Sequence, residues 1–354
     1  KKMTTLYLII LWRGCKNMNR KDEHIQYALS QDVNCNDFDQ IRFVHNALPN
    51  ISLDEVDITT RIGKHDFIVP IYINAMTGGT KQALELNDAL SKIAASCNIA
   101  MASGSLSIAL KEESVIDTFL VIRKNNPHGF IMANLGADKN IKDARKAIAL
   151  LGANALQLHL NAAQEIIMPE GDRDFSSWEK NVKEICEMSL VDVIVKEVGF
   201  GMCVETMRRL RGLGVKIIDV SGNGGTNFAQ VENSRRKISV DYLDSWGLST
   251  VESLLEARSV ENVEILASGG IRNPLDAVKA LALGAKAVGM ASWFLKLVKE
   301  NTVEDAVIKT NQFILEIKQI MTLLGARNLR ELRTKPMVLS NELRNYCIQR
   351  NIKI

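Results

Sequence analysis

Two glycine-rich segments, Lys216–Thr226 (KIIDVSGNGGT) and Glu264–Arg272 (EILASGGIR), decide how this chain is expected to fold. Each begins as an apolar run typical of a buried parallel strand and ends in a tight turn. Glycines let the backbone approach a phosphate closely, and the turn offers N–H groups and small hydroxyls to its oxygens. Two such loops, late in a chain of alternating strands and helices, predict a (β/α)8 TIM barrel that holds a phosphorylated ligand at the carboxyl ends of its strands.

Working outward, further apolar runs complete a set of eight strand candidates. They are Pro70–Met76, Ile99–Ser103, Phe130–Leu135, Ala155–Leu160, Val191–Glu197, Lys216–Val220, Val263–Ala267 and Ala287–Met290. Amphipathic stretches lie between most of them. Asn273 before Pro274 and Ser249 before Glu252 have the patterns of helix N-caps. A doubly wound open sheet is the alternative, disfavoured because no G-x-G-x-x-G motif follows the first strand.

The bulk composition excludes several classes of protein. The chain has 354 residues, 46% of them apolar, which is enough for one large core. Its formal net charge of +3 is too small to predict a nucleic-acid or membrane partner. Its six cysteines form no Cys-x-x-Cys pair, which argues against a disulfide scaffold and a zinc site and favours a cytoplasmic location.

Three parts are expected along the chain. Residues 1–17 hold a seven-residue apolar run, too short to span a bilayer, and are interpreted as a non-native or upstream-translated extension rather than an export signal. Residues 18–68 form a polar N-terminal arm. Residues 69–354 form the barrel with C-terminal helices, and the charged stretch Phe228–Trp246 is an insertion after strand six.

Residues just past each strand of a barrel face one pocket, and several here have side chains suited to chemistry. Lys196 follows the wholly apolar run Val191–Val195 and could stabilise an anionic ring, or could simply end a strand in solvent. Glu165 is either a metal ligand or a surface carboxylate. His159 is either functional or a satisfied histidine at the rim. The segment Asn19–His24 is either a solvated arm or a clamp for an anionic substrate.

Six segments together closely resemble the type 2 isopentenyl-diphosphate isomerases, the flavin-dependent class. They are Arg20–His24 (RKDEH), Ala75–Gly79 (AMTGG), Gln157–Glu165 (QLHLNAAQE), Lys196–Gly201 (KEVGFG), Ser221–Thr226 (SGNGGT) and Ala267–Arg272 (ASGGIR). They occur in order from residue 18 to the end of the barrel, and their combination is highly specific although other flavin barrels share single pieces. Cys203 and the stretch Ala291–Phe294 depart from the commoner versions of the pattern.

The resemblance implies an FMN-binding homo-tetramer or homo-octamer that interconverts isopentenyl diphosphate and dimethylallyl diphosphate, with Mg2+ and with NADPH as reductant. Its implied flavin contacts are Ala75, Met76, Thr77, Ser105, Asn134, Lys196, Ser221, Thr226, Gly270, Arg272, Ala291 and Ser292. Its implied substrate contacts are Arg20, Lys21 and His24 on the diphosphate, with His159, Asn161 and Gln164 lining the rest. Glu165 is implied to bind Mg2+, and Gln164 and His159 are the implied catalytic side chains.

The reaction adds a proton at C4 of the substrate and removes one from C2, so it needs a strong acid. The predicted pocket offers no evident carboxylate pair, and the resemblance implies that reduced FMN is itself the acid/base centre. One rival is an FMN-dependent 2-hydroxy acid oxidoreductase, which would need a histidine base where Ser221–Thr226 stands. Another is a non-catalytic phosphate-ligand-binding barrel.

Overall fold

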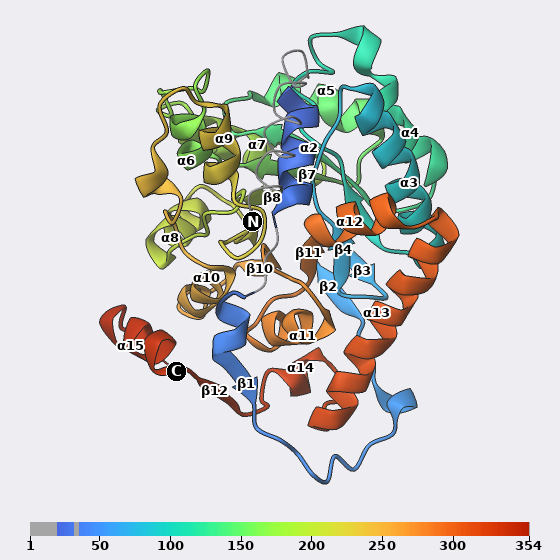
Figure 1. The fold of residues 1–354 in the computed structure, drawn as a ribbon, viewed down its shortest axis with the longest axis vertical. Helices are drawn as coiled ribbons and strands as arrows, with labels where there is room; N and C mark the ends of the chain where they lie inside the picture. Colours follow the sequence, from blue (N-terminus) through green and yellow to red (C-terminus); the bar gives the residue numbers. More distant parts are fainter. Residues whose placement is uncertain (1–19, 32–34, 354) are drawn as a thin grey trace, which may run out of the picture.

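The central feature of the computed structural model, which describes residues 20–31 and 35–353, is a closed barrel of eight parallel strands (Figure 1). Around the barrel the strands follow the order β10-β11-β4-β5-β6-β7-β8-β9. They are β4 (Ile71–Ile73), β5 (Ala100–Ala102), β6 (Ile131–Gly136), β7 (Ala155–His159), β8 (Asp192–Lys196), β9 (Ile217–Asp219), β10 (Glu264–Ser268) and β11 (Val288–Met290). All eight predicted strands are present, and the predicted TIM barrel is confirmed.

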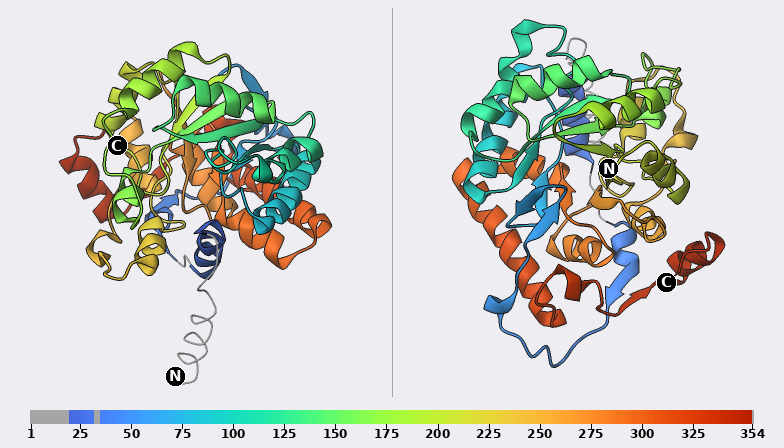
Figure 2. Two further views of the ribbon diagram at one scale, coloured as in Figure 1. Left: turned by 90° about the horizontal axis from the view of Figure 1, so that it is seen from above. Right: turned by 180° about the vertical axis from the view of Figure 1, so that it is seen from behind.

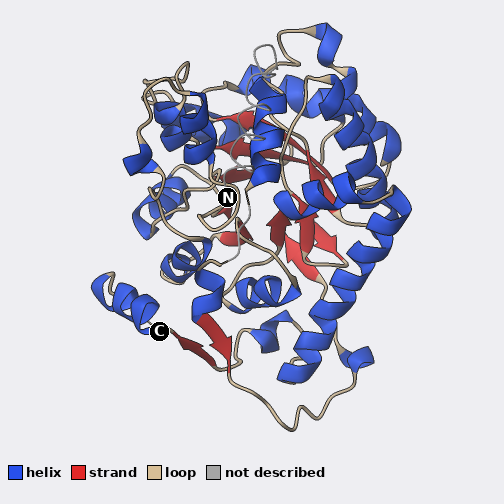
Figure 3. Ribbon diagram, in the orientation of Figure 1, coloured by secondary structure: helices blue, strands red, loops and turns tan. Residues whose placement is uncertain are grey.

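Helices enclose the barrel, as the view coloured by secondary structure shows (Figure 3). Between the strands lie α3 (Lys81–Cys97), α4 (Asp117–Asn125), α5 (Ile141–Leu151), α6 (Ala162–Ile167), α7 (Trp178–Met188), α8 (Val204–Gly212), α9 (Phe228–Arg235), α10 (Thr250–Ala257) and α11 (Pro274–Ala282). After β11 come α12 (Ser292–Glu300), α13 (Val303–Leu324), α14 (Leu329–Leu332) and α15 (Asn341–Gln349). The predicted insertion after strand six contains α9 and a 3-10 turn at Asp241–Leu243.

The barrel is filled from its amino-terminal end by apolar side chains. Ile217, Ile194, Met132 and Leu266 are buried inside it. An antiparallel hairpin of β2 (Thr60–Ile62) and β3 (His65–Phe67) places Ile62 against the same cluster. The backbone N–H groups of this hairpin donate to Glu264 and Asp192, at the starts of β10 and β8. The hairpin thus closes the end of the barrel opposite the two glycine-rich loops.

The residues that precede the first barrel strand contact the barrel at both of its ends. Helix α2 (Arg20–Ser30) packs against α3, α9 and α12. Strand β1 (Ile41–Phe43) instead pairs with β12 (Met337–Leu339) beside the peripheral α15, which lies at the edge of the molecule in each view (Figure 2). In the described part of segment 18–68, predicted as one arm, α2 and Asn36 lie at the mouth of the barrel, where the Asn36 side chain donates to the carbonyl oxygens of Gly224 and Gly270. The hairpin of β2 and β3 lies at the opposite end.

Two further expectations concern the termini and the cysteines. The predicted extension 1–17 lies outside the described residues. The five cysteines that the structure describes, at positions 35, 97, 186, 203 and 347, are all free thiols, as expected from their spacing. Within residues 20–31 and 35–353, no helix combines the length and hydrophobicity needed to cross a bilayer.

Candidate active site

A cavity of about 400 Å3 lies at the carboxyl ends of the barrel strands, beneath α2. Its volume lies in the range of small-molecule and cofactor sites. The structure brings together in its lining all of the predicted site residues except Arg272. These are Arg20, Lys21, His24, Ala75, Met76, Thr77, Ser105, Asn134, His159, Asn161, Gln164, Glu165, Lys196, Ser221, Thr226, Gly270, Ala291 and Ser292.

The two glycine loops touch each other backbone to backbone and form one cradle. A Cβ at Gly225 would lie 2.7 Å from the amide nitrogen of Gly270. A Cβ at Gly269 would lie only 2.1 Å from the carbonyl oxygen of Gly222, and φ at Gly269 is +93°. Side chains at these positions would separate the loops, so glycine is required for their contact. The cradle exposes backbone and small hydroxyl groups to the cavity, a donor set that suits a phosphate.

Lys196 ends β8 inside the barrel and is 4% exposed. Its Nζ donates to the carbonyl oxygen of Glu197 over 2.5 Å, and burial lowers its pKa. Glu197 is also buried, which raises the pKa of its carboxyl group to about 8. The same carboxyl group accepts from the backbone N–H groups of Val198 and Phe200, which fixes the turn after Lys196. The ammonium group is therefore held at the cavity wall by a rigid turn.

Thr77 supplies an independent sign that this cavity takes a polar ligand. Its Oγ1 is buried and has no hydrogen-bond partner among the described residues, although the side chain lines the cavity. A buried hydroxyl without a partner is costly, so a ligand that bonds to it would restore the lost contact. With the glycine cradle and Lys196, this wall fits a flavin mononucleotide: it offers donors for a phosphate at one end and a cation and hydroxyl for the ring.

His159 ends β7 and is held as a neutral ring. Its Nδ1 lies 2.9 Å from Oδ1 of Asn134 on the neighbouring strand β6. Burial, helped by the charge of Lys196, lowers the pKa of His159 to about 3. The imidazole therefore remains uncharged throughout the neutral pH range.

Helix α2 brings cations over the mouth of the cavity. The Nζ of Lys21 lies 3.4 Å from the carbonyl oxygen of Ser105 and 5.9 Å from the centre of the Phe119 ring. Burial and the neighbouring Arg20 together lower the pKa of Lys21 to about 8. An anion arriving between the two cations would relieve their repulsion, so this end of the cavity favours a multiply charged anion.

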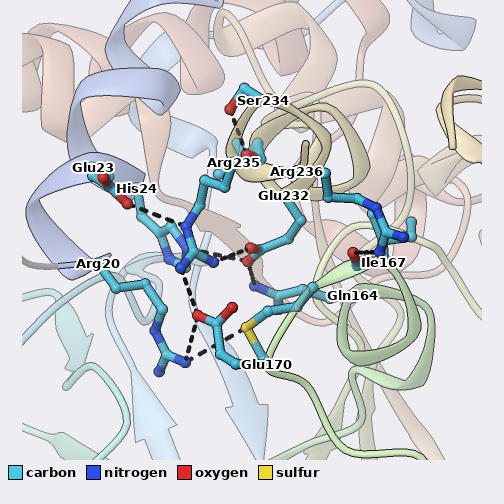
Figure 4. Close-up of polar contacts among 12 residues, drawn as sticks. Arg20, Glu23, His24, Gln164, Ile167, Glu170, Glu232, Ser234, Arg235 and Arg236 are labelled. Carbon is cyan, nitrogen blue, oxygen red and sulfur yellow. Dashed lines mark hydrogen bonds and ion pairs between the residues drawn. The ribbon is translucent and has the colours of Figure 1, made fainter. Parts of the chain in front are cut away.

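Sequence reasoning missed Glu232, a fully buried carboxylate on α9 (Figure 4). Its Oε1 accepts from Gln164 Nε2 over 2.9 Å and lies 3.1 Å from His24 Nε2. Its Oε2 accepts from Arg235 over 2.6 Å. Burial alone would raise the pKa of Glu232, but the contacts with His24, Gln164 and Arg235 lower it to about 2. The only available signal was the position of Glu232 within the charged insertion.

Arg235 extends this cluster and ties the insertion to α2. Its guanidinium donates to Glu23 over 3.1 Å and also to Glu170. Arg20 lies 3.8 Å from the same Glu170 carboxylate (Figure 4). The side of α2 that faces the cavity is thus positioned by the insertion as well as by the barrel.

Glu165 lies on α6 at the rim of the cavity. Its Oε1 accepts from Asn161 Nδ2 and its Oε2 from the backbone N–H of Asp172, both over 2.8 Å. Within the described residues, no group of three or more His, Cys, Asp or Glu side chains is arranged to hold a metal ion. A divalent ion at Glu165 would consequently need most of its ligands from water and substrate.

Arg272 is the predicted flavin contact that the cavity lining does not include. Its guanidinium donates to Asp39, over 2.8 and 2.6 Å, and to Asp276, over 2.8 and 3.1 Å. These bonds raise the pKa of Arg272 and lower that of Asp39 to about 2. The side chain fastens the N-terminal segment to α11 through charge-assisted hydrogen bonds to two carboxylates.

Comparison with known proteins gives a consistent result. Residues 142–339 match the family model described as FMN-dependent dehydrogenase. The chain is 47% identical over 338 residues to isopentenyl-diphosphate delta-isomerase of Staphylococcus epidermidis, covering 95% of this chain and 97% of that protein. It is 48% identical over 340 residues to the protein of the same name from Latilactobacillus sakei, covering 95% of this chain and 97% of that protein.

Solved structures share the fold. The flavin-binding domain of flavocytochrome b2 from baker's yeast aligns with a TM-score of 0.64 at 20% identity, covering 93% of this chain and 87% of that one. A variant of mandelate oxidase aligns with a TM-score of 0.62 at 16% identity, covering 91% of this chain and 94% of that one. At these identities the likeness concerns the barrel architecture and leaves the reaction to be argued from the site.

Proposed function

Because this chain belongs to the flavin-dependent isopentenyl-diphosphate delta-isomerases, we propose that it moves the double bond between isopentenyl diphosphate and dimethylallyl diphosphate using reduced FMN and Mg2+. The observation that carries the proposal is that one cavity offers two separate places for anions. The glycine cradle lies beside Lys196, whereas Arg20 and Lys21 cover the mouth from α2. A cofactor phosphate and a substrate diphosphate can therefore be held at once.

The cofactor would occupy the wall formed by the glycine cradle. Ser221, Thr226 and Gly270 would surround its phosphate, together with Ala291 and Ser292 at the start of α12. Thr77 Oγ1 would gain the partner that it lacks, and Lys196 would face the ring as a cation. Ala75, Met76, Ser105 and Asn134 complete this wall. When bound and reduced, the flavin supplies the strong acid that an unactivated alkene requires.

The substrate diphosphate would lie between α2 and Glu165. Arg20 and Lys21 would contact its oxygens, and Mg2+ on Glu165 would neutralise part of its charge. Mg2+ is commonly bound by one or two carboxylates together with substrate phosphates, which agrees with a single carboxylate at this place. The role of the protein here is to fix the diphosphate so that the alkene lies over the cofactor.

Gln164 would orient the reacting end of the substrate. Its Nε2 is committed to Glu232, which leaves its Oε1 as an acceptor toward the cavity. Glu232 is ionised at neutral pH and holds both Gln164 and His24 at their places. Asn161, which donates to Glu165, and the neutral His159 would line the remaining surface. These side chains would also limit the access of water to the reacting carbons.

We further propose NADPH as the reductant of the flavin, the cytoplasm as the location, and a homo-tetramer or homo-octamer as the assembly. These proposals rest on the family resemblance. The reductant is needed because the oxidised cofactor is a poor acid, although the isomerisation itself consumes no electrons.

The decisive experiment is an anaerobic assay of the FMN-loaded protein with isopentenyl diphosphate and Mg2+. Dimethylallyl diphosphate should form after the flavin is reduced, and little should form with oxidised flavin. Oxygen-dependent consumption of a 2-hydroxy acid by the same preparation would instead identify an oxidoreductase. Bound flavin with neither reaction would favour a binding protein.

A further inference from the structure

A chain of buried amide side chains connects His159 at the rim to Asp219 inside the barrel. Asp219, at the end of β9, is fully buried. Its Oδ2 accepts from Tyr72 over 2.7 Å and from Asn74 Nδ2 over 3.3 Å. Its Oδ1 accepts from the backbone N–H of Ser221 over 3.2 Å. Ser268 donates to both oxygens.

The chain continues from Asn74 to the rim through the barrel interior. Asn74 Oδ1 accepts from Gln157 Nε2 over 3.5 Å, and Gln157 Oε1 accepts from Asn134 Nδ2 over 3.1 Å. Asn134 Oδ1 then lies 2.9 Å from His159 Nδ1. Asn74, Gln157 and Asn134 are all buried, so water is not a ready substitute for any partner.

Every link in this chain has a fixed direction because a carboxylate can only accept. Asn74 must present its NH2 group to Asp219, and its Oδ1 also accepts from the backbone N–H of Ala75 over 2.8 Å. Gln157 must therefore donate to Asn74 and accept from Asn134. Asn134 is left with Oδ1 toward the ring, so His159 must carry its proton on Nδ1. The remaining nitrogen, Nε2, is then an acceptor.

We propose that Asp219 is a positioning residue that sets the tautomer of His159 through Asn74, Gln157 and Asn134. His159 then offers ligands in the cavity a hydrogen-bond acceptor at Nε2, a consequence that rests on the proposed function. The tautomer itself is a property of the protein without ligands. The charged groups that face His159 are Lys196, Lys21, Lys139 and Asp138. Of these, only Asp138 would favour a proton on Nε2.

Asp219→Asn should reverse the donor-to-acceptor direction of the hydrogen bonds between Asp219 and His159. The new side chain must keep an oxygen toward the N–H of Ser221, which turns its NH2 group toward Asn74. Two donors then face each other. Rotation of Asn74, Gln157 and Asn134 removes that conflict, at the cost of the hydrogen bond that Asn74 Oδ1 accepts from the backbone N–H of Ala75. The rotated Asn134 presents an NH2 group to His159, which moves the ring proton to Nε2. Tyr72→Phe is the matched control, because it removes a hydrogen bond to the same carboxylate without changing any amide of the chain.

The test is nitrogen NMR of uniformly labelled, flavin-free protein, since protonated and unprotonated imidazole nitrogens have well-separated shifts. The chain has five histidines, so loss of one signal set in His159→Gln assigns the ring. Wild type and Tyr72→Phe should show the Nδ1–H form, and Asp219→Asn should show loss of that form in favour of Nε2–H. In the flavin-loaded enzyme, Asp219→Asn should lower kcat at least about tenfold with KM for the diphosphate unchanged.

An Nε2–H form in the wild type would overturn the proposal and would indicate control by Asp138. An unchanged Nδ1–H form in folded Asp219→Asn would also overturn it. If Asp219→Asn fails to fold, the wild-type spectrum still decides, because the proposal requires Nδ1–H there. None of these spectra depends on turnover, so a failure of the isomerase assay would leave this test intact.

Discussion

Lys21 should control the alkaline limit of substrate capture. Burial and Arg20 lower its pKa to about 8, so its charge is present below that pH and lost above it. Since kcat/KM reports the ionisation of the free enzyme, it should fall above pH 8 by a factor that approaches ten per pH unit. At high pH, kcat/KM of the wild type should level off at the value measured for Lys21→Ala, because neutral lysine and alanine both lack the charge. A charged hydrogen bond contributes about 1.5–3 kcal/mol, which places that floor about 10- to 150-fold below the plateau.

Lys21→Arg separates this explanation from others, because a guanidinium stays protonated throughout the range. The pH profile of kcat/KM for Lys21→Arg, measured anaerobically with reduced enzyme from pH 6 to about 10, should lack the descending limb near pH 8. Lys139→Arg is the matched control: Lys139 lines the same cavity, and its replacement should leave the limb in place. A limb that persists at the same midpoint in Lys21→Arg would refute the assignment and would direct attention to Glu197, whose pKa is also about 8.

Other consequences can be measured with purified variants. Glu165→Gln should weaken the dependence of activity on Mg2+ while FMN remains bound, and an unchanged Mg2+ titration would contradict the metal role. Gly270→Ala should lower FMN affinity in a flavin fluorescence titration, since its Cβ would lie 2.7 Å from the carbonyl oxygen of Gly224 at a φ of +77°; Gly212→Ala, at an open helical position, should not. Deleting residues 1–24 should raise the KM for isopentenyl diphosphate, whereas deleting residues 1–17 should leave it unchanged; equal KM values would exclude a clamp.

The barrel could be predicted because each strand is a short apolar run followed by a polar loop. Two helix N-caps could also be predicted from the sequence. In the structure the Asn273 side chain accepts from the N–H of Asp276, and Ser249 forms a capping box with Glu252. The hairpin of β2 and β3 could not be found in this way. Its strands have three residues each and are closed by contacts with Asp192 and Glu264 far along the chain. Tertiary contacts rather than local propensity create it.

The site was predictable where topology alone places a residue at the mouth of the barrel. Lys196 and Ser221 follow strands, and the closed barrel brings them together. Glu232 belongs to a helix in an insertion and meets Gln164 across 68 positions of sequence. The position of Arg272 after a glycine loop also suggests the cavity, but its guanidinium binds Asp39, 233 positions away, and does not line the cavity. Neither partner can be inferred from sequence spacing.

The environment of His159 bears on the rival proposal of a 2-hydroxy acid oxidoreductase. Removing a proton from the carbon of a 2-hydroxy acid requires a base whose pKa is near the working pH. Burial, helped by the charge of Lys196, lowers the pKa of His159 to about 3, so its neutral imidazole is a weaker base than an ordinary histidine. The loop after β9, Ser221–Thr226, contains no histidine that could replace it. A neutral ring held by Asn134 can still accept a hydrogen bond at Nε2, which fits the proposal that the cofactor, rather than a side chain, would exchange protons with the substrate.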